Sequence, residues 1–427
     1  MKRILWAILA LVTSANAAYS QTCWTIGTDG SIELNPERIV LPYSDHIEMS
    51  GEQVSCVLRW MVDEKGLFGQ ERSLVFPMLR RVPNDTHASL LYRMGTDVMS
   101  LVGINSLVPK QLSTKKVSID GGLSVISEYG VGKANVGGAR GDNPKPVAEV
   151  RTTVFPSKVH PMLCEIYSIR NISASPLVLN VPKFSQEAKT LADKGVDGSY
   201  VIRADIFGSG TYVLAPRNEI RFHAAFQAYR ADTERMIVPD IDAEYSARMS
   251  FIRDAIDSSL ILETPDTVIN TEFRFAKIRA SESIYRTKGG LMHGPGGESY
   301  YAALWCNDEC EYVNPFYPFL GYAVGNESAF NCYRLYSGFM NDDFKPVPSS
   351  IIAEGTDIWD GAGDRGDAAM IAHGLSRYLL ARGDKNEAEQ LWPFLKWCLE
   401  YCHRKLNAAG VPESDSDELE GRFPAGD

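Results

Sequence analysis

The hydrophobic periodicity of this chain changes once, near residue 235, and that change constrains the fold more than any other feature. Before it, apolar and polar residues alternate in short runs, as in 24–34, where an Asp-Gly pair separates two of them. After it, apolar residues recur every three to four positions, as in 367–381. A two-residue period is typical of strands and a 3.6-residue period of helices. The sequence therefore predicts a multidomain chain with a β unit followed by an α unit.

The first unit has the pattern of an antiparallel β-sandwich, and we place this domain at residues 22–235. The segments 163–181 and 200–229 contain short apolar runs separated by turn residues, which is typical of sandwiches, and 200–229 has the pattern of a meander. The stretch 120–144 is rich in Gly, Asn and Asp, so we expect it to be a long loop. Its glycines do not fit the G-x-G-x-x-G pattern of nucleotide sites.

The second unit begins with a linker helix, which we place at residues 240–265. Further helices are expected at 270–285, 326–340, 367–381 and 384–406. Gly383 suits the end of one helix. Asp384, with Glu387 three residues later, has the spacing of a capping box for the next. The remaining segments, 287–325, 341–365 and 407–427, are expected to be loops, and loops this long in a compact domain usually carry function.

The first 17 residues resemble a secretory signal peptide. Lys2 and Arg3 precede a short apolar stretch that ends in small residues up to Ala17, where we expect cleavage. The apolar stretch is shorter than the roughly 20 residues that span a bilayer, so we expect no membrane insertion. The mature protein is expected to be secreted or periplasmic, where its cysteines could form one or two disulfides.

The charge balance excludes some partners. The formal net charge is −11, whereas proteins that bind nucleic acids or anionic membranes generally present a basic surface. We therefore expect no nucleic-acid partner.

Three loops combine acidic side chains with aromatic residues or arginine, which is the pattern expected of sugar chemistry. In glycoside hydrolysis one carboxylic acid protonates the leaving oxygen and a second carboxylate activates water or attacks. Other acids bind hydroxyl groups, and aromatic faces cover the C–H face of a sugar ring. We expect the loops to converge at one end of the helical domain. His293 could line the same site, and Asp364 is expected to cap the helix that follows it. The candidate substrate-binding residues are Trp305, Asp308, Glu309, Trp359, Asp360, Arg365 and Asp415, and the candidate catalytic residues are Asp417 and Glu420.

Metal sites are the competing chemical interpretation. Calcium could be held by Asp415, Asp417 and Glu420, or by Asp240 and Asp242, although neither group has EF-hand spacing. Two C-x3-C pairs, 306/310 and 398/402, could in principle bind zinc, but residues 398 and 402 lie on an apolar helical stretch and suit core packing better. Two-carboxylate sugar chemistry requires no cofactor.

The order of a β-sandwich, a linker helix and helical hairpins with acidic-aromatic loops resembles the six-hairpin glycosidases, in which an (α/α)6 toroid follows an N-terminal β super-sandwich. Glu413-Ser414-x-x-Asp417 is similar to the E-S-x-x-D segment of trehalases and related α-glucosidases. That resemblance implies that Asp417 is the general acid of an inverting hydrolase. A rival match is the D-x4-E-x6-D spacing of α-L-rhamnosidases, which would make Glu420 the acid.

A toroid of six hairpins needs more helices than the segment 266–427 provides. We therefore expect this segment to be the N-terminal part of a glycosidase domain, with the general base further downstream and with little activity in the 427-residue chain. The alternative function is that of a non-catalytic carbohydrate-binding or surface protein. The clustered acids favour the enzyme, because a binder needs aromatic residues but no acid cluster. The sugar, the linkage and the oligomeric state stay open.

Overall fold

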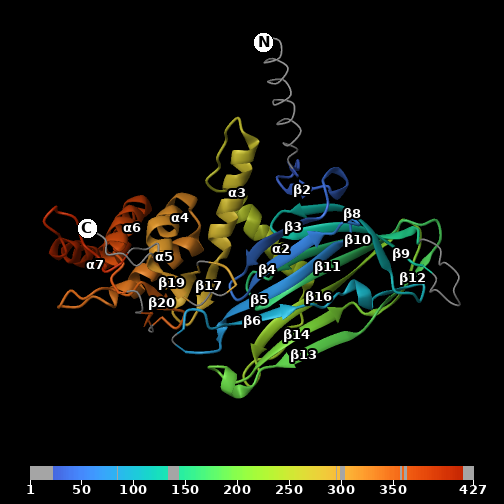
Figure 1. Cartoon of the computed structure of the whole chain (residues 1–427), viewed down its shortest axis with the longest axis horizontal. Coiled ribbons are helices and arrows are strands. Elements are labelled where there is room, and N and C mark those ends of the chain that lie inside the picture. Colours follow the sequence, from blue (N-terminus) through green and yellow to red (C-terminus); the bar gives the residue numbers. More distant parts are fainter. Residues whose placement is uncertain are drawn as a thin grey trace, which may run out of the picture.

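The computed structural model contains an extended β part, and a helical part lies at one end of it (Figure 1). It describes residues 23–83, 85–132, 144–294, 296–298, 303–355, 358–359 and 363–416, with only the backbone described at 358–359. Strands precede helices along the chain, as the change of periodicity predicted. The signal peptide predicted at residues 1–17 lies outside these ranges. Within them, no helix combines the length and the apolar character that crossing a bilayer requires.

The largest sheet, sheet A, is antiparallel and has the order β1-β2-β8-β9-β10-β11-β16-β14-β13. Its strands are β1 (Trp24–Ile26), β2 (Ile32–Leu34), β8 (Lys110–Ile119), β9 (Leu123–Gly130), β10 (Pro146–Pro156), β11 (Met162–Asn171), β13 (Phe184–Lys189), β14 (Tyr200–Phe207) and β16 (Glu219–Arg230). β1 and β2 form the hairpin that the Asp-Gly pair predicted, with Trp24 opposite Leu34.

Two smaller antiparallel sheets complete the β part. Sheet B has the order β3-β4-β5-β6 and sheet C the order β15-β12-β7. Their strands are β3 (Tyr43–Ser50), β4 (Ser55–Val62), β5 (Phe68–Arg80), β6 (Ser89–Met94), β7 (Gly103–Ile104), β12 (Leu177–Val181) and β15 (Gly210–Leu214). Short 3-10 turns lie at Pro36–Arg38 (η1), Met99–Leu101 (η2) and Ala192–Lys194 (η3).

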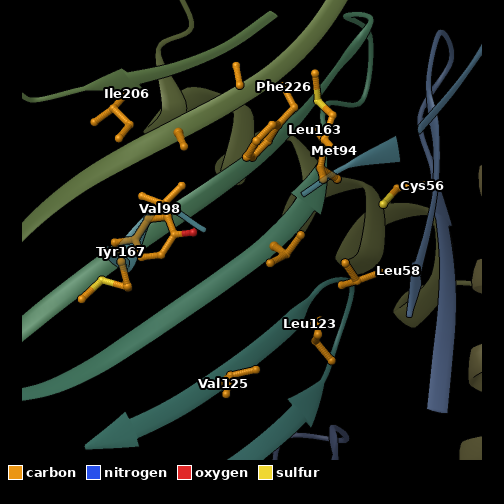
Figure 2. Close-up of a cluster of buried hydrophobic side chains, with 14 of the residues drawn as sticks. Cys56, Leu58, Met94, Val98, Leu123, Val125, Leu163, Tyr167, Ile206 and Phe226 are labelled. Carbon is orange, nitrogen blue, oxygen red and sulfur yellow. The ribbon is translucent and has the colours of Figure 1, made fainter. Parts of the chain in front are cut away.

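The β core lies where the inward faces of sheets A and B meet (Figure 2). Leu58 on β4 and Met94 on β6 belong to the same buried cluster as Leu163 on β11 and Phe226 on β16. Each strand contributes alternate residues, because successive side chains of a strand point to opposite faces. Burying these apolar faces against each other is what holds the layers together.

Two predictions about the β part are wrong in detail. The segment expected to be a loop at 120–144 contains β9, which pairs with β8 across a turn where Gly121 has a φ of 67°. The segment 200–229 is not a simple meander, because β15 leaves sheet A and pairs with β12 while β14 and β16 pair directly.

The helical part begins with α2 (Ile241–Phe251), which continues as a π-helical turn, η4 (Ile252–Asp257). The helices that follow are α3 (Thr267–Glu282), α4 (Asn314–Leu320), α5 (Ala323–Ser337), α6 (Asp367–Arg382) and α7 (Lys385–Arg404). Gly383 ends α6 in the left-handed conformation, and Asp384 caps α7 by accepting from the amides of Asn386 and Glu387, as predicted. These hairpins agree with the predicted β-then-α order, and their closure into a toroid stays a proposal.

The long segments predicted as loops contain short elements that carry the site. Strands β17 (Ile284–Thr287) and β18 (Gly290–His293) form a hairpin, and β19 (Ala303–Trp305), β20 (Ser350–Ile352) and β21 (Ile358–Trp359) form a small sheet. A second π-helical turn, η5 (Asp308–Val313), follows β19 and leads into α4. The prediction of structureless loops at 287–325 and 341–365 is therefore wrong.

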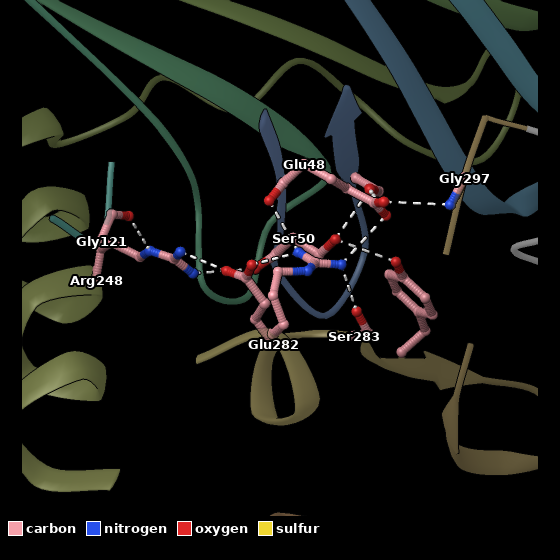
Figure 3. A network of polar contacts seen from close by, with 10 residues as sticks. Glu48, Ser50, Gly121, Arg248, Glu282, Ser283 and Gly297 are labelled. Atoms are coloured by element: carbon pink, nitrogen blue, oxygen red, sulfur yellow. Dashed lines mark hydrogen bonds and ion pairs between the residues drawn. The ribbon is translucent and has the colours of Figure 1, made fainter. Parts of the chain in front are cut away.

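A buried polar network joins the β part to α2 and α3 (Figure 3). Arg248 on α2 donates to the carbonyl oxygens of Gly121 at 2.7 Å and Ser50 at 3.1 Å, and it pairs with Glu282 on α3. Arg279 also pairs with Glu282 and donates to the carbonyl oxygen of Glu48 at 2.9 Å. The network fixes the end of α3 against sheet B, and from there the chain enters the hairpin β17–β18.

Candidate functional site

The first part of the candidate site is the start of η5. β19 places Trp305 in the interior, where the residue is 8% exposed, and the amide of Cys306, the next residue, donates to the carbonyl oxygen of Ser349 at 2.9 Å. Asp308 and Glu309 then open η5, Asp308 half-buried and Glu309 fully buried. The strand and the turn together bring an aromatic side chain and two acids to one segment.

Glu309 is held by a histidine from the neighbouring hairpin. Nδ1 of His293, the last residue of β18, lies 3.0 Å from Oε1 of Glu309. Oε2 of Glu309 is buried and has no hydrogen-bond partner within the described residues. Burial raises the pKa of Glu309, and the charge of His293 opposes that rise. Such a carboxyl group keeps a proton more readily than one in water.

The second loop supplies Arg365 and two buried acids at the start of α6. The side chains of Asp364, Arg365 and Asp367 are at most 7% exposed. Gly366 adopts a φ of 86°, and its amide donates to Oδ1 of Asp364 at 2.9 Å. This turn places Asp367 in the first turn of α6. The sulfur of Cys306 lies 3.6 Å from the carbonyl oxygen of Asp367. The second loop therefore packs against the segment that carries Asp308 and Glu309.

Burial also governs the acids of both loops. Burial raises the pKa of Asp367 to about 6, although a hydrogen bond from the backbone amide of Arg365 and the positive charge of Arg365 act to lower it. It raises the pKa of Asp308 as well, while His293 and Arg365 act to lower it. Arg365 is thus close enough to influence acids from both loops. The arrangement provides a carboxylic acid that is partly protonated just below neutral pH, beside a guanidinium group.

The third loop meets the second through backbone contacts. The amides of Asp415 and Ser416 both donate to the carbonyl oxygen of Asp364, at 2.8 and 3.1 Å. The amide of Asp364 donates in return to Oδ2 of Asp415 at 3.1 Å. The carboxylate of Asp364 accepts from the hydroxyl of Tyr401 on α7 and lies 3.6 Å from Nζ of Lys405. We call the group formed by His293, Asp308, Glu309, Asp364, Arg365, Asp367 and Asp415 the loop site.

The structure describes some of the site residues predicted from the sequence and not others. Trp305, Asp308, Glu309, Arg365 and Asp415 lie at the positions given above. Asp360, Asp417 and Glu420 lie outside the described residues, as does the side chain of Trp359, whose backbone is part of β21.

Sequence reasoning misses the partners that complete the loop site. It marks His293 only as a residue that could line a site, and it gives Asp364 the role of capping α6, which is wrong because Gly366 occupies the cap position. It does not single out Asp367, Tyr401 or Lys405. The signal for Asp367 is its place immediately after Arg365 and Gly366.

The proposed metal ligands have other partners where the structure describes them. Asp240 caps α2 by accepting from the amide of Ala243 at 3.1 Å, and Asp242 lies 3.0 Å from Arg221. Cys398 is fully buried in the helical core, in agreement with its predicted packing role. In the part of the chain that the structure describes, no group of three His, Cys, Asp or Glu side chains is arranged to hold a metal ion.

Comparison with known proteins gives weak likenesses. No protein-family model and no curated protein matches the chain. One similar solved structure is a human-microbiome protein described as a kojibiose phosphorylase, with 9% identity, a TM-score of 0.44 and coverage of 94% of this chain and 61% of that one. Another is a bacterial glucoamylase in complex with acarbose, with 8% identity, a TM-score of 0.28 and coverage of 88% and 70%. The chain thus spans about 61% of the length of the phosphorylase. Likenesses this weak assign no role to a residue of the loop site.

Proposed function

We propose that the chain is a carbohydrate-active enzyme, or the N-terminal portion of one, that hydrolyses glycosidic bonds by an inverting mechanism with two carboxyl groups. The observation that carries the proposal is the grouping of Asp308, Glu309 and Asp367, whose pKa values are all raised by burial, with Arg365 near Asp308 and Asp367 and with His293 bonded to Glu309. Glycoside hydrolysis needs an acid that keeps its proton near the working pH and further polar groups that grip sugar hydroxyls. The loop site supplies residues of both kinds.

Asp417 is the proposed general acid, and Glu420 is the rival. Both follow Ser416 in the chain, and the amide of Ser416 donates to Asp364 in the loop site. This contact supports a role for the third loop in the same site as Arg365 and Asp367. In an inverting enzyme the acid and the base stand about 6.5–9.5 Å apart, with a water molecule between the base and the sugar. We propose that the base lies downstream of the third loop.

In this proposal, the described residues bind substrate and leave the proton transfer to the third loop. Arg365 is buried and positively charged, so it suits a sugar hydroxyl or the leaving-group oxygen, which gains negative charge as the bond breaks. Asp308 is half-buried and can accept hydrogen bonds from sugar hydroxyls. The signal peptide supports a secreted or periplasmic location, where oligosaccharides from outside the cell would be met. Edman sequencing of the exported protein would test cleavage after Ala17.

The assignment of the acid is tested by replacing Asp417 with Asn in the 427-residue chain and in any longer form of the gene product. In the form that is active, Asp417→Asn should lower the rate on substrates with poor leaving groups by about 10²–10⁴, the usual value of general acid catalysis. Activated aryl glycosides should lose much less, because their leaving groups need little protonation. The measurement is kcat on both substrate types.

Glu420→Gln is the matched control. If it abolishes activity while Asp417→Asn does not, the acid is Glu420 and the rhamnosidase-like spacing is correct. Equal losses on both substrate types for both variants would argue against an acid role for either residue. Oligosaccharide binding without hydrolysis in every form of the protein would favour the non-catalytic alternative.

A further inference from the structure

The β-sandwich contains a cavity with polar walls that opens to the surface beside Gly69 and Gly95. Its volume is about 210 Å³, and it lies between β5 of sheet B and strands β8 to β11 of sheet A. A sandwich core is ordinarily filled by apolar side chains from the two inner faces. This cavity is lined instead by a mixture of polar and apolar side chains, among them Phe68, Gln70, Arg72, Asp97, Val125, Tyr129, Thr152 and Tyr167.

A buried ion pair forms one wall of the cavity. Nε and Nη2 of Arg72 donate to the two carboxylate oxygens of Glu165 at 2.5 and 3.0 Å. Gln70 and Tyr167 donate to the same carboxylate at 3.0 and 2.5 Å. The side chains of Arg72 and Glu165 are 3% and 0% exposed. A buried pair of this kind contributes little net stability compared with apolar residues of the same volume, so stability alone does not account for it.

The network leaves hydrogen-bonding groups for an occupant of the cavity. Oε1 of Gln70 is buried and has no partner within the described residues, although the amide nitrogen of the same side chain is bonded to Glu165. Tyr129 and Thr152 add hydroxyl groups to the lining. Burial, with a smaller contribution from Asp97, raises the pKa of Tyr129, so its hydroxyl stays protonated and can donate. A buried acceptor without a donor is costly, so the amide group of Gln70 is not fully satisfied by the protein itself.

The charge and size of the cavity indicate the chemical class of the occupant. Arg72 and Glu165 neutralise each other, and Asp97 is held by the amides of Met99 and Ser100, which favours an uncharged molecule with hydroxyl donors over an anion. Amide and hydroxyl groups beside Phe68 and Tyr129 suit a ligand with several hydroxyls and one apolar face. The volume has room for several water molecules, so a ligand the size of one sugar ring can enter the cavity. We propose that this cavity binds a single neutral sugar unit, at a site separate from the loop site.

The proposal is tested by calorimetric titration of the purified chain with D-glucose, D-galactose, D-mannose and L-rhamnose in turn. At least one of these sugars should bind at one site per chain and raise the thermal unfolding temperature. Tyr129→Phe, which removes one oxygen atom from the cavity wall, should weaken that binding tenfold or more. Gln70→Met should weaken it further, because it also removes a donor to Glu165.

Two controls separate this site from others. Tyr212→Phe also removes one hydroxyl, but Tyr212 lies on β15 and bonds to the carbonyl oxygen of Gly208, so sugar binding should be unchanged. Arg365→Ala disrupts the loop site and should leave binding in the cavity intact. Binding that is lost in Arg365→Ala and kept in Tyr129→Phe would overturn the proposal. The absence of binding by any of the four sugars to the folded wild-type chain would overturn it too, without bearing on hydrolysis at the loop site.

Discussion

At the scale of the residue, burial rather than identity distinguishes the acids of the loop site. Asp308 and Glu309 could be chosen from the sequence because they lie beside Trp305 in an acidic-aromatic stretch. The partner of Glu309 could not, because His293 is 16 residues away and reaches it only when β18 packs against η5. The only feature of Asp367 visible in the sequence is that it is an acidic residue at the start of a predicted helix. Its burial depends on the packing of α6 against η5 and α4, which a single sequence does not reveal.

Asp367→Asn should make the protein more stable above pH 6 and have little effect near pH 4. The folded protein holds the proton of Asp367 up to a pKa of about 6, whereas the unfolded chain releases it near 3.8. Folding therefore costs progressively more as the pH rises from about 4 to 6, and asparagine removes that cost because it is never charged. A pKa difference of about 2 corresponds to roughly 3 kcal/mol at most.

The measurement is urea unfolding of the wild type and the variant at pH 4, 5, 6 and 7. Asp415→Asn is a suitable control, because Asp415 belongs to the same site and is exposed. A difference in unfolding free energy between wild type and Asp367→Asn that does not grow between pH 4 and 6 would contradict the assignment.

At the scale of the element, the sequence predicted those helices and strands that carry their own end signals. The start of α7 at Asp384 and the end of α6 at Gly383 were both predicted, because capping is a local property. β9 was missed, because glycine-rich sequence on either side made 120–144 look like one loop although 123–130 alternates in the manner of a strand. α4 was missed because its sequence, NPFYPFL, is short and contains two prolines.

Asp384→Ala should destabilise the protein by about 1 kcal/mol, the usual cost of losing an N-cap side chain. Oδ1 of Asp384 accepts from the amides of Asn386 and Glu387 at 2.9 and 3.1 Å, and alanine leaves both amides without that partner. Asp384→Asn keeps an acceptor oxygen at the same place and should destabilise the protein by only a few tenths of about 1 kcal/mol. Thermal unfolding of the three proteins measures the difference. An asparagine variant as unstable as the alanine variant would argue against capping as the cause.

At the scale of the whole molecule, the β part and the helical part are joined by long-range polar contacts that no local pattern predicts. Arg248 bonds to Ser50, 198 positions earlier in the chain, and pairs with Glu282 on the next helix. Further along the junction, Arg286 pairs with Glu52 at 2.8 Å and Arg80 pairs with Glu354 at 3.0 Å. The order of the two parts follows from periodicity, whereas their arrangement depends on these pairings.

Arg248→Met should destabilise the protein by about 3–5 kcal/mol, because it leaves the buried carboxylate of Glu282 with only one of its two arginine partners. It also removes the donors to the carbonyl oxygens of Ser50 and Gly121. Arg286→Met breaks a pair at the same junction, but the side chain of Arg286 is 61% exposed, so the loss should be under about 1 kcal/mol. Urea unfolding followed by tryptophan fluorescence and by far-ultraviolet circular dichroism measures both effects.

A double variant, Arg248→Met with Glu282→Leu, distinguishes loss of charge balance from loss of packing. If the uncompensated carboxylate is the main cost, the double variant should be more stable than Arg248→Met, because apolar residues in place of a buried pair are often tolerated. If the bonds to Ser50 and Gly121 hold the junction instead, the double variant should be no more stable than Arg248→Met. The β part and the helical part should then unfold at different urea concentrations, so fluorescence and circular dichroism should give different transition midpoints. A cost for Arg248→Met no larger than that for Arg286→Met would mean that the buried network does not couple the two parts.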